Sequence, residues 1–325
     1  MSRQLSFDLP ALPALGRDDF FVSRSNAAAV AMIEGWQDWP ARKLALIGPK
    51  GAGKTHLVHV WAGLSGGRIV AAEMLARLVY PVANPTFPYQ VAKGYYARIG
   101  QDKLNGRVTR LLVSPLLIAL KRVIGDRDYL DYLRSFRYPL SGEFAMRTNI
   151  LPDLRIPSDW GLEIGVLSEA WRNLAPKAVC QVEIADSYDH KHQQLSPDDA
   201  AQGLNRMSTD ICKAIFRKLA ADGTIFTNNV FRTLKATYYR SALDLLEAYF
   251  SDAQMNGLTV DRHAEEASIE LFAESIMRAG QTFLDNPQET PFIATWNRVH
   301  SADPDFIRDM QAAAMADAKE YSEGS

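Results

Sequence analysis

Apolar side chains recur at three- or four-residue intervals in several stretches, and this spacing predicts helices. One helix is expected over residues 25–36, with Ser25 or Asn26 as its N-cap, and another over residues 54–64. From about residue 205 the chain reads mainly as helices, with Gly223 as a C-cap. Two apolar stripes support this reading: Ile211, Ile215 and Leu219 in one, and Ile269, Phe272 and Ile276 in the other.

Short apolar runs bounded by glycine, proline or polar residues predict strands. We expect strands over residues 43–47, 68–72 and 178–185, and around residues 161–167. Along the chain, the predicted order is therefore a short α/β segment, a middle segment of mixed helices and strands, and a helical C-terminal segment.

Composition narrows the function classes. Of 325 residues, 47% are apolar, which is typical of a globular protein rather than a disordered one. A net charge of −2 gives no argument for direct binding of nucleic acid or an anionic membrane. The longest apolar run, Leu111–Leu120, is too short to cross a bilayer and predicts a buried or cleft-lining segment.

The cellular compartment is predicted from cysteines and from the N-terminus. Two cysteines, Cys180 and Cys212, cannot form a disulfide framework, which favours a reducing cytoplasm. Asp8 interrupts the segment where a signal peptide needs an apolar core. We therefore expect a cytoplasmic protein.

The sharpest motif is GPKGAGKT over residues 48–55, which matches the phosphate-binding loop G-x-x-x-x-G-K-[ST]. Glycines allow backbone N–H groups to surround phosphate oxygens, and a following helix directs its positive end at the same anion. Lys54 would reach the terminal phosphates and Thr55 would bind magnesium. The alternative is a glycine-rich turn. The predicted phosphate-binding residues are Gly48, Gly51, Gly53, Lys54 and Thr55.

Residues 1–75, with QLSFDL at 4–9, FFVSRSNAAAV at 20–30 and LALIGPKGAGKTHLVHVWA at 44–62, resemble the start of AAA+ replication regulators of the Hda and DnaA type. The resemblance implies ATP or ADP at the loop. It also implies docking on the DNA polymerase sliding clamp through Gln4, Leu5 and Leu9. The run of four apolar residues ending Asp-Glu that such ATPases need is missing, so we expect no ATP hydrolysis.

Four further motifs follow LVYP at 78–81 and KGYYAR at 93–98. They are GRVT at 106–109, SGEFA at 141–145, GLEIG at 161–165 and DHKH at 189–192. In this order they resemble the C-terminal half of the glucosyl-3-phosphoglycerate synthases. These are retaining glycosyltransferases with a GT-A fold that binds nucleotide sugars. The resemblance implies UDP-glucose as donor, 3-phosphoglycerate as acceptor, Mg²⁺ or Mn²⁺ as cofactor, and compatibility with a homodimer.

The same resemblance assigns residue roles. Gly106, Arg107 and Thr109 would hold the acceptor phosphate, for which a guanidinium fork and a hydroxyl are suited. Glu163 would lie near the transferred sugar as the catalytic carboxylate. The remaining assignments are Ser141, Gly142 and Glu143 for the donor, His192 for the acceptor, and His190 for the metal.

Each assignment has a plainer alternative. Arg107 could lie on the surface at a helix N-terminus, Glu143 could pair with an arginine, and Glu163 could be a carboxylate favoured by a helix dipole. A lone surface histidine such as His190 is usually no ligand. The Asp-x-Asp that these transferases carry at the end of a strand has no equivalent, because residues 126–128 and 303–305 follow a helix and a loop.

The sequence therefore predicts an α/β chain in two parts. Residues 1–75 would form a P-loop strand–loop–helix fragment. Residues 76–325 would form a partial GT-A-like mixed α/β region that is helical from about residue 205. Two functions follow: glucose transfer to 3-phosphoglycerate, or nucleotide binding by a clamp-docking module without ATPase activity. The sequence leaves open whether the junction near residues 66–78 is a genuine gene fusion.

Overall fold

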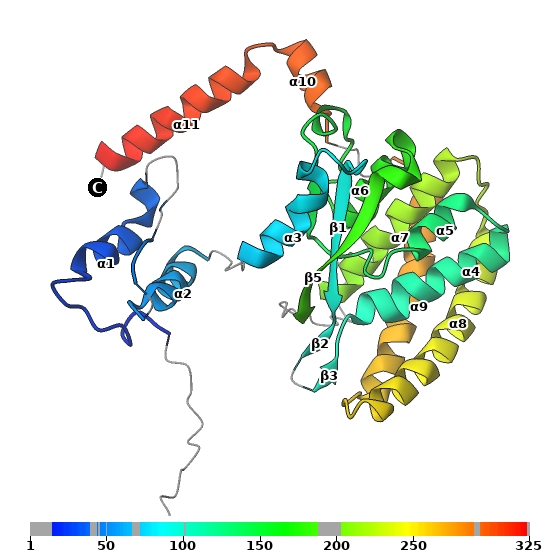
Figure 1. The fold of residues 1–325 in the computed structure, drawn as a ribbon. Coiled ribbons are helices and arrows are strands. Elements are labelled where there is room, and N and C mark those ends of the chain that lie inside the picture. The colour runs from blue at the N-terminus through cyan, green and yellow to red at the C-terminus, as the bar shows by residue number, and fades with distance from the viewer. Residues whose placement is uncertain are drawn as a thin grey trace, which may run out of the picture. The chain divides into compact units, whose positions relative to one another are not determined.

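A computed structural model describes residues 15–39, 44, 46–49, 51–66, 72–100, 102–187, 203–288 and 293–323 (Figure 1). The chain divides into two compact units, residues 1–72 and 73–325. In the described part, no helix combines the length and the apolar character needed to cross a membrane.

The first unit is a small helical cluster. The predicted helices are confirmed as α1 (Ala27–Glu34) and α2 (Lys54–Ser65), joined through the 3-10 turn η1 (Trp36–Asp38). Its core is formed by five buried side chains: Phe20, Val30, Ile33, Leu57 and Val60. The helices are held together by this core, because each presents an apolar face that water would otherwise contact.

The strand predicted over residues 43–47 is wrong for the residues that the structure describes. Leu44 and Leu46–Pro49 have no strand partner, and Leu44 and Leu46 pack on the helical core instead. An isolated apolar run gains strand hydrogen bonds only beside a second strand. The predicted strand over 68–72 lies outside the described residues except for Ala72, which begins a helix.

The second unit is a mixed α/β region with a helical C-terminal part, as predicted. Its described helical elements before residue 200 are α3 (Ala72–Ala83), the π-helix η3 (Val108–Val113), α4 (Ser114–Ile124), α5 (Asp128–Arg134), η4 (Leu151–Asp153), α6 (Leu162–Asn173) and η5 (Pro176–Ala178). Those after residue 200 are α7 (Gly203–Ala221), α8 (Asn228–Met255), α9 (Arg262–Asp285), α10 (Trp296–Ala302) and α11 (Phe306–Glu323).

A three-stranded sheet organises the unit, with the order β4–β1–β5. Strand β1 (Val91–Ala97) pairs antiparallel with β4 (Phe144–Met146) and parallel with β5 (Val179–Ser187). Strand β5 confirms the strand predicted at 178–185. A separate hairpin joins β2 (Ile99–Gly100) and β3 (Lys103–Leu104) directly after β1.

The strand predicted around residues 161–167 is wrong, because this segment forms the first half of α6. Its glycines serve packing rather than a strand boundary. A Cβ on Gly165 would lie 2.3 Å from Cγ of Pro157, so only glycine allows that loop to approach the helix.

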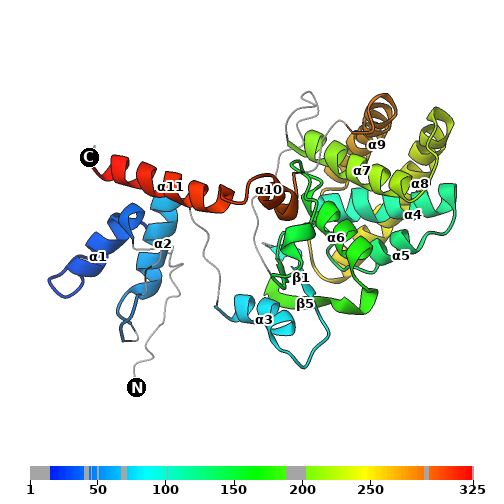
Figure 2. The same cartoon turned by 90° about the horizontal axis from the view of Figure 1, so that it is seen from above.

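Apolar side chains of the helices form the main core of the second unit. Figures 1 and 2 show α4, α7, α8 and α9 lying side by side, away from α3. Both predicted apolar stripes are buried here: Ile211, Ile215 and Leu219 on α7, and Ile269, Phe272 and Ile276 on α9. The run Leu111–Leu120 is also buried, in η3 and α4, as its composition predicted.

Helices α8 and α9 approach closely where Gly280 faces the buried ring of Phe231. A Cβ at Gly280 would lie 2.7–2.9 Å from three ring carbons. We predict that Gly280→Ala lowers the free energy of unfolding by about 1–3 kcal/mol, because the ring must shift within a packed core. Chemical denaturation followed by circular dichroism measures this change.

The matched control is Gly63→Ala in α2, where a Cβ meets nothing within 4 Å. Alanine favours helix over glycine by up to about 1 kcal/mol, so this variant should be as stable as the parent or more so. Equal denaturation midpoints for Gly280→Ala and the parent would contradict the close approach.

Candidate functional site

A buried lysine lies at the centre of the candidate site. Lys93, in the middle of β1, is 2% exposed, and its ammonium donates a hydrogen bond to the carbonyl of Ser141. The Phe144 ring lies 5.6 Å from the same nitrogen, measured to the ring centroid. A buried ammonium needs nearby negative charge, because desolvation disfavours its charged form.

Two predicted carboxylates, Glu143 and Glu163, supply that charge. Burial lowers the pKa of Lys93 to about 8, while Glu163 and then Glu143 act in the opposite direction. Burial likewise raises the pKa of Glu163, opposed by a backbone hydrogen bond and by Lys93. Near neutral pH the lysine is therefore charged and interacts with both carboxylates.

Local backbone structure brings the two carboxylates to β1. Glu163 lies in the first turn of α6, so its alternative as a helix-dipole carboxylate is consistent with the structure. The N–H of Gly94 donates to the carbonyl of Glu143 at 2.7 Å, and the Glu143 carboxylate accepts from the Tyr96 hydroxyl at 3.3 Å. A Cβ at Gly94 would lie 3.1 Å from that same glutamate.

The other two predicted donor residues take different positions. Ser141 is buried, and its hydroxyl donates to the carbonyl of Gly94, so its side chain fixes the loop against β1. Gly142 is exposed, and a Cβ there would lie 3.9 Å from Oε1 of Glu163. Gly142 therefore leaves the approach to Glu163 unobstructed.

Aromatic and cationic side chains connect this cluster to the predicted acceptor loop. The Arg98 guanidinium lies 5.3 Å from the Tyr138 ring and 5.9 Å from the Tyr96 ring. The Tyr138 side chain in turn lies near the buried hydroxyl of Thr109. Burial raises the pKa of Tyr138, so its hydroxyl stays protonated at neutral pH.

The predicted acceptor loop, residues 106–109, begins at Gly106. This glycine has φ of +77° and lies against the Arg98 side chain. This left-handed conformation favours glycine. Arg107 follows and forms an ion pair with Glu265 of α9, with its side chain 33% exposed. The structure thus brings Gly106, Arg107 and Thr109 into the same array as Glu143 and Glu163.

The P-loop motif, in the first unit, forms a separate candidate site. Gly51 and Gly53 have positive φ, and α2 begins at Lys54 as the motif requires. The Lys54 ammonium donates to the carbonyls of Gly48 at 2.8 Å and Pro49 at 2.6 Å. Thr55 is exposed.

Several predicted residues lie outside the described part of the chain. These are Gln4, Leu5, Leu9, His190 and His192. Among the described residues, no three histidine, cysteine, aspartate or glutamate side chains gather as a metal-binding group. The described residues alone therefore do not provide a complete ligand set for Mg²⁺ or Mn²⁺, and we derive no step through a metal.

Lys93, Tyr96, Arg98 and Tyr138 were not among the predicted site residues. A charged residue inside the apolar run of β1 is a sequence signal that could have singled out Lys93. Glu265 gave no such signal, because its partner Arg107 is 158 residues away.

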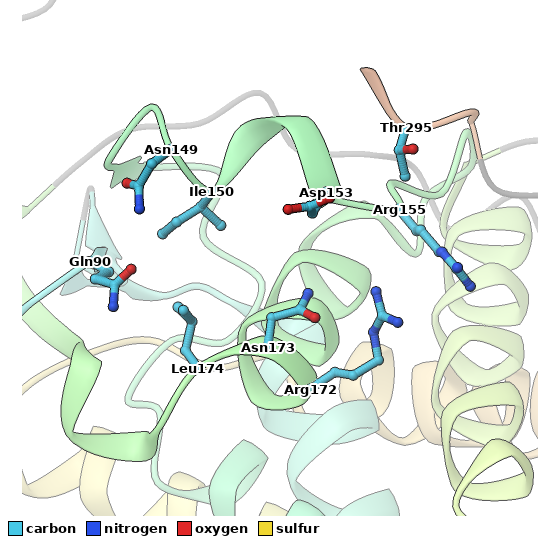
Figure 3. Close-up of a pocket in the computed structure, with 9 residues that line it drawn as sticks. All are labelled: Gln90, Asn149, Ile150, Asp153, Arg155, Arg172, Asn173, Leu174 and Thr295. Carbon is cyan, nitrogen blue, oxygen red and sulfur yellow. The ribbon is translucent and has the colours of Figure 1, made fainter. Parts of the chain in front are cut away.

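A cavity of about 450 Å³ lies at the C-terminal end of α6, the opposite end from Glu163 (Figure 3). Glu169 holds one of its lining arginines, Arg172, through two hydrogen bonds. The lining residues are Gln90, Asn149, Ile150, Asp153, Arg155, Arg172, Asn173, Leu174 and Thr295. The described sequence-predicted site residues are not among them.

Comparison with solved structures gives partial matches. The mannosyl-3-phosphoglycerate synthase of Rubrobacter xylanophilus is 22% identical, with a TM-score of 0.39 over 49% of this chain and 45% of that one. The glucosyl-3-phosphoglycerate synthase of Mycobacterium tuberculosis, solved with Mn²⁺, UDP-glucose and phosphoglyceric acid, is 23% identical. Its TM-score is 0.35 over 54% of this chain and 57% of that one.

Sequence relatives give a stronger match, although no protein-family profile matches the chain. The glucosyl-3-phosphoglycerate synthase of Persephonella marina is 45% identical over 233 residues, which is 72% of this chain and 57% of that protein. The corresponding enzyme of Methanococcoides burtonii is 38% identical over 257 residues, or 78% and 62%. These relatives give no support to the resemblance of residues 1–75 to replication regulators. The chain is homologous to glucosyl-3-phosphoglycerate synthases and spans about three fifths of the length of these two relatives.

Proposed function

We propose that residues 73–325 bind a phosphorylated three-carbon acid beside the sugar of a nucleotide-sugar donor. The reaction would transfer glucose from UDP-glucose to 3-phosphoglycerate with retention. The homology to glucosyl-3-phosphoglycerate synthases supports the substrate pair, and the likeness of the motifs supports a GT-A-like arrangement.

The observation that carries the proposal is the pair of half-buried carboxylates, Glu143 and Glu163, beside the buried ammonium of Lys93. Ionised carboxylates accept hydrogen bonds from sugar hydroxyls, and the charged lysine acts to lower the pKa of Glu163, which favours the ionised form of that side chain. Retention requires stabilising positive charge that develops on the sugar carbon, for which a nearby carboxylate is suited. Glu163 would take that role.

The acceptor would bind at the neighbouring loop. Arg107 offers guanidinium donors to a phosphate, and Thr109 lies beside Tyr138 on the path to the carboxylates. His190 and His192 remain predictions for the metal and the acceptor, since both lie outside the described residues. Mn²⁺ in the Mycobacterium tuberculosis enzyme supports a divalent cation as part of the proposal.

We predict that the chain forms glucosyl-3-phosphoglycerate from UDP-glucose and 3-phosphoglycerate with a divalent cation present. Arg107→Ala should lower kcat/KM for the acceptor by about 10- to 100-fold, because a charge-assisted hydrogen bond contributes about 1.5–3 kcal/mol. Product is measured by chromatography.

The control for this prediction is Arg240→Ala, an exposed arginine paired with Asp244 on α8. It should leave the rate unchanged. No product from the folded parent protein, or equal rates for Arg107→Ala and the parent, would contradict the proposed reaction.

The pH dependence of the same reaction tests Lys93. Activity should fall as the pH rises above about 8, because the lysine is charged only below its pKa of about 8. Lys93→Met removes the ammonium that lowers the pKa of Glu163, so the acid limb of the kcat/KM profile should move to higher pH. Lys235→Met, at an exposed ion pair with Glu274, is the control. An acid limb that stays in place would show that Lys93 does not hold Glu163 ionised.

A second candidate function is nucleotide-phosphate binding by residues 48–55. The observation that favours it is the position of Lys54, whose ammonium already lies against the loop carbonyls of Gly48 and Pro49. An incoming phosphate would replace these carbonyls as the partner of the ammonium. Clamp docking through residues 4–9 stays a prediction from sequence.

We predict that ATP or ADP binds the chain with Mg²⁺ and that Lys54→Ala weakens this binding at least tenfold. The reason is the loss of the charged donor that reaches the terminal phosphates. Titration calorimetry measures the Kd. Arg17→Ala, which removes an exposed ion pair with Glu34 in the same unit, is the matched control. Equal ADP affinity for Lys54→Ala and the parent would rule out the loop as the binding site.

A further inference from the structure

We propose that Glu265 of α9 is a positioning residue for Arg107, so that the helical C-terminal part organises the acceptor end of the site. This inference rests on the proposed function, because it takes Arg107 as the group that binds the acceptor.

Glu265 is a buried carboxylate that contacts two arginines. Its Oε1 lies 2.9 Å from Nε of Arg107, and its Oε2 lies 2.8 Å from Nη1 of Arg110. Glu265 is 4% exposed and Arg110 is 7% exposed. A buried carboxylate with two cationic partners is strongly held in place, since losing either partner leaves charge uncompensated.

The contact with Arg107 uses one edge of the guanidinium. Glu265 takes the Nε hydrogen, and the structure records no partner for the terminal nitrogens of Arg107 among the described residues. These nitrogens carry four further hydrogens in a planar fork, which is the geometry that matches phosphate and carboxylate oxygens. Fixing Nε restricts the rotation of the whole fork and lowers the entropic cost of ligand binding.

Arg110 extends the same network to the turn before Gly106. Its Nε donates to the carbonyl of Asn105 at 2.9 Å, and its Nη2 donates to the carbonyl of Leu104 at 3.3 Å. The guanidinium also lies 5.2 Å from the Tyr249 ring of α8. Glu265 thus fixes both Arg107 and, through Arg110, the backbone that precedes it.

The charge of this group suits an anion. Two guanidinium groups and one carboxylate leave a net charge of about +1 beside Gly106, in a setting where solvent screens poorly. The segment Val108–Val113 is a π-helix, an arrangement that occurs frequently at functional sites. An acceptor with a phosphate and a carboxylate meets both a positive charge and a fixed donor fork here.

The test is Glu265→Gln, which keeps the shape of the side chain and removes its charge. We expect the Kd of 3-phosphoglycerate, measured by titration calorimetry, to rise about tenfold, with a similar rise in the acceptor KM. The KM for UDP-glucose should change less than twofold. The control is Glu266→Gln, at the residue next to Glu265. It removes an exposed ion pair with Arg262 and should change none of these values.

A double-mutant cycle separates positioning from a general structural effect. In the Arg107→Ala background, Glu265→Gln should cause no further loss of acceptor affinity. A further tenfold loss there, or equal weakening of donor and acceptor, would overturn the inference. If Glu265→Gln does not fold, Glu265→Asp keeps the charge and serves in the same cycle.

The outcomes also distinguish this inference from the proposed function. If the parent protein does not bind 3-phosphoglycerate, the proposed function fails. If the parent binds it and Glu265→Gln binds it equally well, only the inference about Glu265 fails.

Discussion

The buried ammonium of Lys93 is the constraint on which the candidate site depends. Burial alone would drive this lysine toward its neutral form, and its pKa falls to about 8 even with two carboxylates nearby. Its charge is retained at neutral pH because the loop at Ser141 supplies a carbonyl and Glu143 and Glu163 supply negative charge. The sheet, that loop and the start of α6 must therefore meet at one point.

From this point the site extends as one connected array. Arg98 lies over the rings of Tyr96 and Tyr138, and Tyr138 lies near Thr109 of the predicted acceptor loop. Helix α9 then contributes Glu265. In the proposed function, the helical core would support the end that binds the acceptor anion, and the sheet would support the end that carries the carboxylates.

Local patterns predicted much of the fold but little of the site's internal chemistry. The apolar stripe that contains Ile269 is a buried helix face, as predicted, because the spacing of apolar residues follows directly from which face of a helix is buried. The segment at Gly161 is a helix and not a strand, and its glycines allow α6 to pack closely against α7 and against the loop at Pro157. Leu44, Leu46 and Ile47 form no strand, because no described segment pairs with them. The contact between Arg107 and Glu265 joins residues far apart in sequence, which no local pattern encodes.

The described residues offer three candidate places for an anion: the loop after Gly106, the P-loop at Lys54, and the cavity lined by Arg155 and Arg172. A crystal structure of the complex with 3-phosphoglycerate distinguishes them most directly. Our account predicts the phosphate within hydrogen-bond distance of the Arg107 guanidinium. A phosphate bound at Lys54 or in the cavity, with none at Arg107, would contradict this account.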